Sequence, residues 1–507
     1  MIINLQDWIQ EADLLSMQKA MVTGECTSEA LVLAYIERIH RYNPLINAVL
    51  EINPDALEIA RNLDNELKTT GSRGPLHGIP ILLKDNIDTN DRMHTSAGSI
   101  ALAESFAPED SYIAAKLRAA GAVILGKANM TEWSNFMSSG MPAGYSSRGG
   151  YVLNPYGPGK LFVSGSSSGS AAAIAADLAA AAIGTETAGS IIGPASQHFL
   201  VGIKPTVGLA SRSGIIPISI SQDTPGPISK TVTDAAILLG AIAGTDENDK
   251  ATWTSPHRTY HDYTTYLDRD FLRKARIGIP RHYYRSLDEE RLSIMESAID
   301  VLREQGATVI DPMDINLEQH PWNNDVICYE FKKGLNHYLS KLNSDIPVHS
   351  LQELIAYNQK HAASLLQFGQ DNLIRSEQNA LTETTYQLKR QEYNQLAVVQ
   401  GIDYALDQHG LDALMLPGDI DGMYIAARLG YPLITVPAGY SAKGTIDADG
   451  DSTQGPFGVV FSGRAFSEPT LISIAYSFEQ ATLCRRPPEL GEWILPRRDR
   501  GNQNCYG

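Results

Sequence analysis

The chain has 507 residues, of which 43% are hydrophobic and 20% charged, an ordinary globular composition with enough apolar side chains for a large core. Its formal net charge is -17 and no segment forms a basic stripe, so the charge argues against nucleic acid or an anionic membrane surface as a partner. The length allows two or three domains, and we expect one domain over residues 1–507.

Cysteine usage and apolar segments narrow the class further. Cys26, Cys328, Cys484 and Cys505 are widely spaced, so neither a disulfide framework nor a zinc site is indicated. No apolar run approaches the ~20 residues of a membrane span. The first residues also lack the basic and apolar parts of a secretory signal. We therefore expect a cytoplasmic protein without a metal site, and homo-oligomerisation stays open.

The first third of the chain alternates helical and strand patterns. Apolar residues recur at helical spacing over 6–40. The apolar run 79–84 follows a turn-rich segment, ends in Lys84 and is typical of a buried strand. A helix near 110–120 then leads into a second buried strand at 121–126. This alternation predicts an α/β fold with parallel strands.

Two loops of small residues frame an alanine-rich segment. Residues 164–170 contain only Ser and Gly, and residues 184–193 are again mostly small and polar. Between the loops, residues 171–182 are almost all alanine, which predicts one long, closely packed helix. The apolar residues 161–163 suggest a strand before the first loop.

The second half contains one helical segment and a return to strands. Residues 255–400 are richer in charge and helical periodicity, and we interpret them as a helical insertion or lid. Strands are predicted at 413–417, 433–437 and 457–461, with a surface loop over 440–456. The catalytic core would then span about 60–240 and 410–485.

Two motifs match ligand-binding patterns only in part. Residues 121–127 fit the glycine-lysine frame of a phosphate-binding loop, but Ala128 replaces the hydroxyl residue that binds magnesium. A buried strand is the favoured interpretation. Residues 447–451 resemble a calcium loop without its closing Glu, so a turn between strands is favoured there.

A third motif leaves an alternative hydrolase open. Residues 165–169 fit the G-x-S-x-G pattern of a nucleophile elbow, which would make Ser167 the nucleophile of an α/β-hydrolase-type esterase. That mechanism needs an acid and then a histidine downstream. The candidates His282 and His409 stand in no recognisable setting.

Lys84 and the second small-residue loop suggest a different hydrolytic site. A serine that attacks an amide needs a base, donors for the oxyanion and an acid for the leaving amine. A lysine is a base only where burial lowers its pKa, and Lys84 ends an apolar run. The small residues of 184–190 would let successive backbone N–H groups face one cavity.

Four motifs occur in the order seen in the amidase signature family. They are Gly78-Ile79-Pro80 with Leu83-Lys84-Asp85-Asn86, the 165–170 loop, the 184–191 loop, and Gly202-Ile203-Lys204-Pro205-Thr206. The chain resembles this family densely over about 5–240 and more loosely over 410–485. The resemblance implies an α/β/α layered fold on a large, mixed, twisted sheet.

The resemblance also implies the roles of individual residues. Ser190 would be the nucleophile, Ser166 the proton relay and Lys84 the base. Ser166 follows Gly165 directly, at the position of the serine that the family holds by a cis peptide bond. The implied oxyanion hole consists of the backbone N–H groups of Thr187, Ala188, Gly189 and Ser190. Neither a metal nor an organic cofactor is implied.

The pattern is most similar to bacterial peptide amidases, which release ammonia from C-terminal peptide amides. The similarity rests on Ile192 and on the segments 211–218 and 221–224, and it implies a small-molecule or short peptide amide as substrate. Segments 136–148 and 320–375 differ most and are expected to shape specificity. Four positions depart from the common family pattern: Ala188, Ile192, His198-Phe199 and Gly418. An amidase subunit of a glutamine-dependent transamidation complex stays open as a second function.

Overall fold

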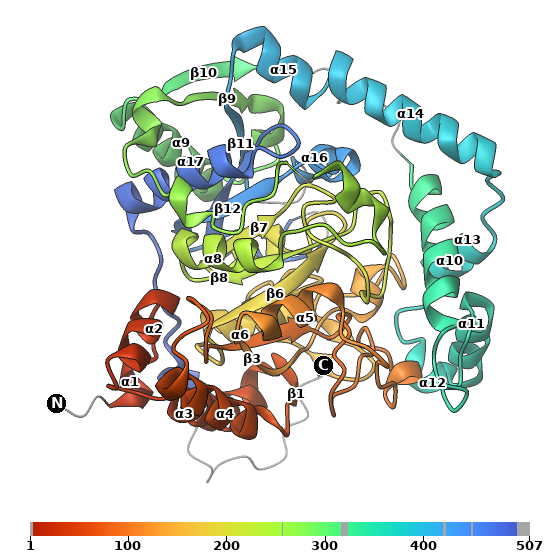
Figure 1. The fold of residues 1–507 in the computed structure, drawn as a ribbon. Helices are drawn as coiled ribbons and strands as arrows, with labels where there is room; N and C mark the ends of the chain where they lie inside the picture. Colours follow the sequence, from red (N-terminus) through yellow and green to blue (C-terminus); the bar gives the residue numbers. More distant parts are fainter. Residues whose placement is uncertain (1–3, 256, 316–322, 419–421, 448–449, 494–507) are drawn as a thin grey trace.

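The alternation of apolar runs and turns after residue 79 builds the centre of one large mixed sheet (Figure 1). The computed structural model describes residues 4–255, 257–315, 323–418, 422–447 and 450–493. Within these residues the sheet has 11 strands, in the order β1-β3-β2-β6-β8-β7-β12-β13-β11-β9-β10. The strands are β1 (Val49–Ile52), β2 (Pro80–Lys84), β3 (Val123–Ala128), β6 (Ala181–Glu186), β7 (Val201–Lys204), β8 (Thr224–Ser229), β9 (Arg276–Pro280), β10 (Thr308–Met313), β11 (Ala413–Pro417), β12 (Leu433–Ser441) and β13 (Gly455–Ser462), and a separate hairpin joins β4 (Tyr145–Ser146) to β5 (Gly150–Tyr151).

Helices cover the sheet in an α/β/α arrangement. For example, α6 contacts β6, α8 contacts β8 and α17 contacts β12. The helices are α1 (Leu5–Trp8), α2 (Leu14–Val22), α3 (Ser28–Ile46), α4 (Ala56–Thr69), α5 (Tyr112–Ala119), α6 (Ser168–Ala175), α7 (Ile192–Ser196), α8 (Val232–Ile242), α9 (Glu289–Glu304), α10 (Asp325–Leu339), α11 (Leu351–Lys360), α12 (Ala362–Leu365), α13 (Asp371–Glu377), α14 (Glu383–Val399), α15 (Ile402–His409), α16 (Met423–Leu429) and α17 (Glu468–Thr482). None of these described helices is long and apolar enough to cross a lipid bilayer.

Most predicted elements are confirmed. The strands at 79–84 and 121–126 are β2 and β3, and the helix near 110–120 is α5. The three strands predicted after residue 410 are β11, β12 and β13. β2 pairs in parallel with both β3 and β6, as expected for connections through helices. Their carboxyl ends therefore lie along one edge of the sheet, where Lys84 and Glu186 end their strands.

The prediction of a long alanine helix is wrong. α6 ends at Ala175, Asp177 takes a left-handed conformation (φ 54°), and the chain re-enters the sheet at Ala181 as β6. The reason is tertiary, because Arg38 of α3 donates hydrogen bonds to the carbonyl oxygens of Ala176 and Asp177 at 2.9 Å each. The end of the helix is thereby satisfied where alanine propensity would continue it. The strand suggested at 161–163 is also absent from the described structure.

The segment 255–400 is not purely helical, because its first part contains strands as well as a helix. β9 and β10 lie within it and extend the main sheet, with α9 between them, so its first third belongs to the sheet. The helices α10 to α13 form a separate layer to one side (Figure 1). Their apolar residues, among them Phe331 and Leu335, share a core with Trp133, Met137 and Ile216 from loops at the carboxyl edge of the sheet. This packing fixes the helical layer next to those loops.

Arg38 gives a direct test of why α6 stops early. We expect Arg38→Gln to lower the free energy of unfolding by about 2 to 5 kcal/mol, because two buried carbonyl groups lose a charged donor. The measurement is urea-induced unfolding followed by intrinsic fluorescence. Arg41→Gln on the same helix is the control, since Arg41 is exposed. Equal unfolding midpoints for the two variants would contradict this account of the helix end.

Candidate active site

Lys84 ends β2 and is fully buried, with an exposed fraction of 0%. Its Nζ donates a hydrogen bond to Oγ of Ser166 at 2.7 Å and to the carbonyl oxygen of Thr185 at 3.1 Å. Within the described residues no carboxylate lies within ion-pair distance of this ammonium group. A buried lysine held by a hydroxyl and a carbonyl group is unusual, because burial penalises its charged form.

Burial sets the protonation of Lys84. Loss of solvation lowers its pKa from 10.5 to about 7, and the nearby charges of Glu186 and Asp223 partly oppose this shift. A substantial fraction of the molecules therefore carries a neutral lysine near neutral pH. In that form Nζ is an acceptor, and the same 2.7 Å contact lets the Ser166 hydroxyl donate to it.

The first small-residue loop brings Ser166 to Lys84 and joins the second loop. The Gly165–Ser166 peptide bond is cis. The N–H of Ser167 donates a hydrogen bond to the carbonyl oxygen of Ser190 at 3.1 Å. The two serines, 24 residues apart in sequence (190 − 166), thus stand on loops that are directly bonded to each other.

The neighbouring serines of the first loop have structural partners. Oγ of Ser167 donates to the carbonyl oxygen of Thr185 at 3.2 Å and accepts from the N–H of that residue at 3.3 Å. Oγ of Ser168 donates to the carbonyl oxygen of Ser164 at 2.7 Å. Both residues are fully buried. The predicted elbow with Ser167 therefore lacks a histidine partner among the described residues, and its hydroxyl closes a loop.

The second loop holds Ser190 through a carboxylate. Oε2 of Glu186 accepts hydrogen bonds from the N–H groups of Ile191 and Ile192 at 2.7 and 2.9 Å. Gly189 has a φ of 81°, a conformation that favours glycine, so the chain turns sharply just before Ser190. The backbone on both sides of Ser190 is therefore fixed.

The Ser190 side chain itself is left available. The residue has an exposed fraction of 7%, and its Oγ makes no hydrogen bond with any described residue. In the part of the chain that the structure describes, the N–H groups of Thr187, Ala188, Gly189 and Ser190 also donate to nothing. Gly189 and Ser190 are buried and Thr187 and Ala188 are half-buried. Successive unused backbone donors beside an open hydroxyl are what an oxyanion site would require.

Two polar residues of the site were not assigned a role from the sequence. Asp223 accepts from Oγ1 of Thr187 at 2.5 Å and from the N–H groups of Ile218 and Ser219, both at 2.8 Å. Asn86 donates to Oγ1 of Thr185 at 3.0 Å. Both residues lie inside motifs shared with the family. Their polar character next to apolar strands was the available signal, but their partners are distant in sequence.

Two departures from the family pattern have local causes. A Cβ atom on Gly418 would stand 2.3 Å from Oγ of Ser196 and 2.4 Å from the carbonyl oxygen of Gly458, so this position has room only for glycine. Ile192 is fully buried in the core beneath β7 and β12. Neither departure removes a hydrogen bond to Lys84, Ser166 or Ser190.

The partial ligand motifs have structural roles where they are described. Lys127 is a buried residue of β3, and its Nζ donates to the carbonyl oxygen of Ile87 at 2.6 Å and to Oγ1 of Thr95 at 2.9 Å. The turn with Asp447 joins β12 to β13, and Ala448 and Asp449 lie outside the described residues. No group of three or more potential metal ligands occurs among the described side chains. Cys26, Cys328 and Cys484 are free, and Cys505 lies outside the described residues.

Comparison with known proteins gives a consistent assignment. The sequence profile of the amidase family matches residues 30–472. A protein of Arabidopsis thaliana described as a probable amidase is 42% identical over 492 residues, covering 95% of this chain and 92% of that protein. The structure of native peptide amidase from Stenotrophomonas maltophilia is 44% identical and superimposes with a TM-score of 0.86, over 95% of this chain and 99% of that one.

A further group of relatives consists of subunits of glutamyl-tRNA(Gln) amidotransferases. One of the subunits of the glutamyl-tRNA(Gln) amidotransferase from Paraburkholderia phytofirmans is 31% identical over 517 residues, covering 95% of this chain and 100% of that protein. The fold, the profile and the relatives agree along nearly the full length. The chain therefore belongs to the amidase signature family.

Proposed function

We propose that this amidase hydrolyses neutral primary carboxamides and releases ammonia, with C-terminally amidated peptides as the leading substrate class. The observation that carries the proposal is the buried contact of 2.7 Å between Lys84 and Ser166, on a loop bonded to the one that bears Ser190. The similarity to a solved peptide amidase over nearly the whole chain supports the peptide class.

In the proposed mechanism, neutral Lys84 takes a proton from Ser166 while Ser166 takes one from Ser190. Oγ of Ser190 forms a bond to the amide carbon, and the electron pair of the carbonyl moves onto its oxygen. The unused backbone N–H groups of Thr187 to Ser190 stabilise that oxyanion. This preorganisation supplies charge stabilisation without reorienting water.

Collapse of the tetrahedral intermediate breaks the C–N bond. Ser166 gives a proton to the leaving nitrogen, and Lys84 returns one to Ser166, so ammonia leaves as a neutral molecule. Water then attacks the acyl group on Ser190 by the same relay in reverse and frees the carboxylic acid. The proposal needs neither a metal nor an organic cofactor.

Replacement of the serines distinguishes the two candidate nucleophiles. Ser190→Ala should reduce ammonia release from a peptide amide to background, because it removes the atom that forms the acyl-enzyme. Ser167→Ala should cost less than about tenfold, since it removes only hydrogen bonds within a loop. The measurement is steady-state ammonia release, with circular dichroism as a check on folding. The esterase alternative would be correct if Ser167→Ala were inactive on amides and esters and Ser190→Ala were not.

The pKa of Lys84 predicts how the rate depends on pH. Because the base must be neutral, kcat/KM should rise about tenfold per pH unit below the pKa of about 7 and level off above it. Burial raises the pKa of Asp223 to about 6, so its protonation should steepen the fall at lower pH by weakening its hold on Thr187. Lys84→Ala should lower the rate by about 10²- to 10⁴-fold.

The pH profile is measured on a neutral peptide amide, which does not itself titrate in this range. Residual activity of Lys84→Ala should lose the step near pH 7. A wild-type profile that is flat from about pH 5.5 to 8.5 would rule out Lys84 as the base. Intrinsic fluorescence over the same range controls for acid unfolding.

A transamidation subunit is the second candidate function, because relatives of that kind align over the full chain. Such a subunit would hydrolyse glutamine and deliver ammonia to an acceptor on a partner protein. We expect the isolated chain to hydrolyse peptide amides at least about a hundredfold faster, in kcat/KM, than glutamine. Preferential hydrolysis of glutamine would favour the second candidate.

A further inference from the structure

A groove of about 1120 Å³ lies between α10, the start of α5 and the loops 212–223 and 246–249. Apolar and aromatic side chains such as Ile215, Pro217 and Tyr338 form much of its wall. Ile220 has an exposed fraction of 62% on the groove lining. An exposed apolar residue on such a lining is typical of a ligand-binding surface.

The inner part of the groove borders the reaction site. Asp223 lines the groove and at the same time accepts the hydroxyl of Thr187, three residues before Ser190. Asp88 lines it too, four residues after Lys84, and its N–H donates to the carbonyl oxygen of Gly214 at 2.8 Å. A peptide that extends from Ser190 past Asp223 would therefore reach the groove.

The groove carries an excess of negative charge. Seven carboxylate side chains and three lysine or arginine side chains line it. Two of the cations already have partners: Arg212 is paired with Asp249 (Nε to Oδ2, 2.7 Å), and Lys333 with Glu383 outside the groove (Nζ to Oε2, 2.9 Å). The potential inside the groove therefore favours positively charged ligands.

Four of these carboxylates are buried and form no ion pair with a described residue, and one of them is Asp246, with an exposed fraction of 5%. Asp88, Asp223 and Glu330 have exposed fractions of 7%, 9% and 4%. Hydroxyl and backbone N–H groups serve as their donors, for example Tyr338 to Asp88 at 2.8 Å and Tyr386 to Glu330 at 2.6 Å. Among the described residues no lysine, arginine or histidine lies within ion-pair distance of the three. Lys127 near Asp88 and Arg212 near Asp223 offset the cost of burial only in part, from a longer distance.

Burial of a carboxylate without a positive partner is costly. It raises the pKa of Asp88 and of Asp223 to about 6. A cation in the groove would offset this cost, whereas an anion would increase it. Since the groove is also apolar, the best match is a positive charge carried on an alkyl chain or a peptide.

We propose that this groove binds the peptide part of an amidated substrate and selects peptides that carry a positive charge, on a lysine or arginine side chain or on the N-terminal ammonium group. The inference rests on the proposed function, because a peptide whose carboxamide reaches Ser190 must extend away from it. Each residue spans at most ~3.3–3.6 Å, so the charge would lie within the first few residues before the amide.

Binding to the Ser190→Ala variant tests the inference without turnover. The probes are tripeptide amides that differ at one point: an acetylated peptide with lysine, the same peptide with norleucine, and the norleucine peptide with a free N-terminus. We expect at least about tenfold tighter binding for a charged probe by isothermal titration calorimetry at low salt, since hydrogen bonds to charged groups are strong. Comparison of the lysine and free-amine probes identifies whether the groove recognises the side-chain charge or the N-terminal ammonium group.

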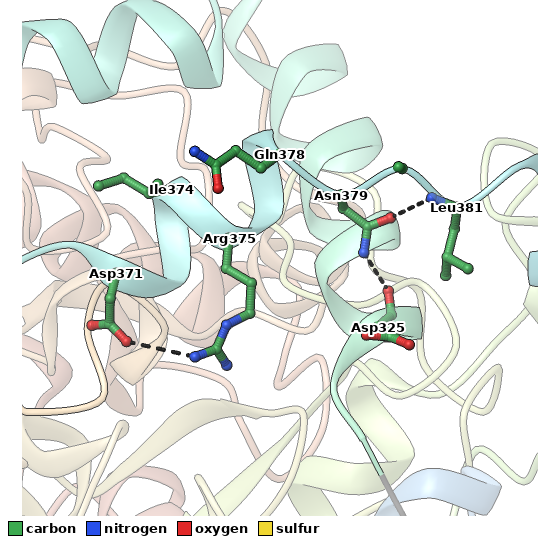
Figure 2. A pocket seen from close by; sticks show the side chains of 8 residues that line it. Asp325, Asp371, Ile374, Arg375, Gln378, Asn379 and Leu381 are labelled. Atoms are coloured by element: carbon green, nitrogen blue, oxygen red, sulfur yellow. Dashed lines mark hydrogen bonds and ion pairs between the residues drawn. The ribbon is translucent and has the colours of Figure 1, made fainter.

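Two substitutions that neutralise groove carboxylates test whether these residues cause the preference for positive charge. Asp88→Asn and Glu330→Gln, each in the Ser190→Ala background, should remove most of the preference for charge. Asp325→Asn is the matched control on the same helix α10, because Asp325 lines a different pocket beside α13 (Figure 2). Asp325 is also paired with Lys389 at 3.5 Å. That variant should keep the preference, which shows that the effect is not due to net charge alone.

Equal affinity for all three probes would overturn the inference, and so would a preference that survives in both Asp88→Asn and Glu330→Gln. Ammonia release from the neutral probe by the wild-type protein is measured separately. Hydrolysis without any preference for charge would remove the groove assignment and leave the amidase function standing. Selective binding without any hydrolysis would remove the proposed amidase function and leave the preference of the groove for positive charge standing.

Discussion

The burial of Lys84 is the constraint on which the rest of the site depends. A lysine in the core carries a large desolvation cost, which is lowered when the group is neutral and hydrogen-bonded. Ser166 and the carbonyl group of Thr185 provide those bonds. The same burial that would destabilise an ordinary lysine lowers the pKa of this one to about 7, as the proposed base requires, so the cost in stability and the proposed chemistry have one physical origin.

The two small-residue loops pack around Lys84 and bond to each other. Small residues let the backbones of the loops approach closely enough for Ser167 to bond to Ser190 directly. Glu186 then fixes the chain after Ser190, and Asp223 fixes Thr187 before it. Both carboxylates act through other residues and are positioning groups. The rigidity of the loop leaves the N–H groups of Thr187 to Ser190 unused, which an oxyanion site requires.

The helical layer packs against the loops that lie next to this centre. Helices α10 to α13 share a core with the loops at the carboxyl edge of the sheet, so the groove wall is packed against the region of the site. In related enzymes the chemistry can stay constant while such a layer varies. The buried carboxylates of the groove, which form no ion pair with described residues, are the basis of the proposed preference for positively charged peptides.

The sequence by itself determined the α/β class and the strands before Lys84 and after residue 410, because these depend on local patterns. Its short motifs predict Lys84, Ser166 and Ser190 as the catalytic residues. Only the tertiary structure decided where α6 ends, since Arg38 comes from a helix more than a hundred residues away in sequence. It also decided that β9 and β10 join the sheet and that Asp223 holds Thr187. Strand order, burial and hydrogen bonds between distant segments arise from packing of the whole chain, which local periodicity does not encode.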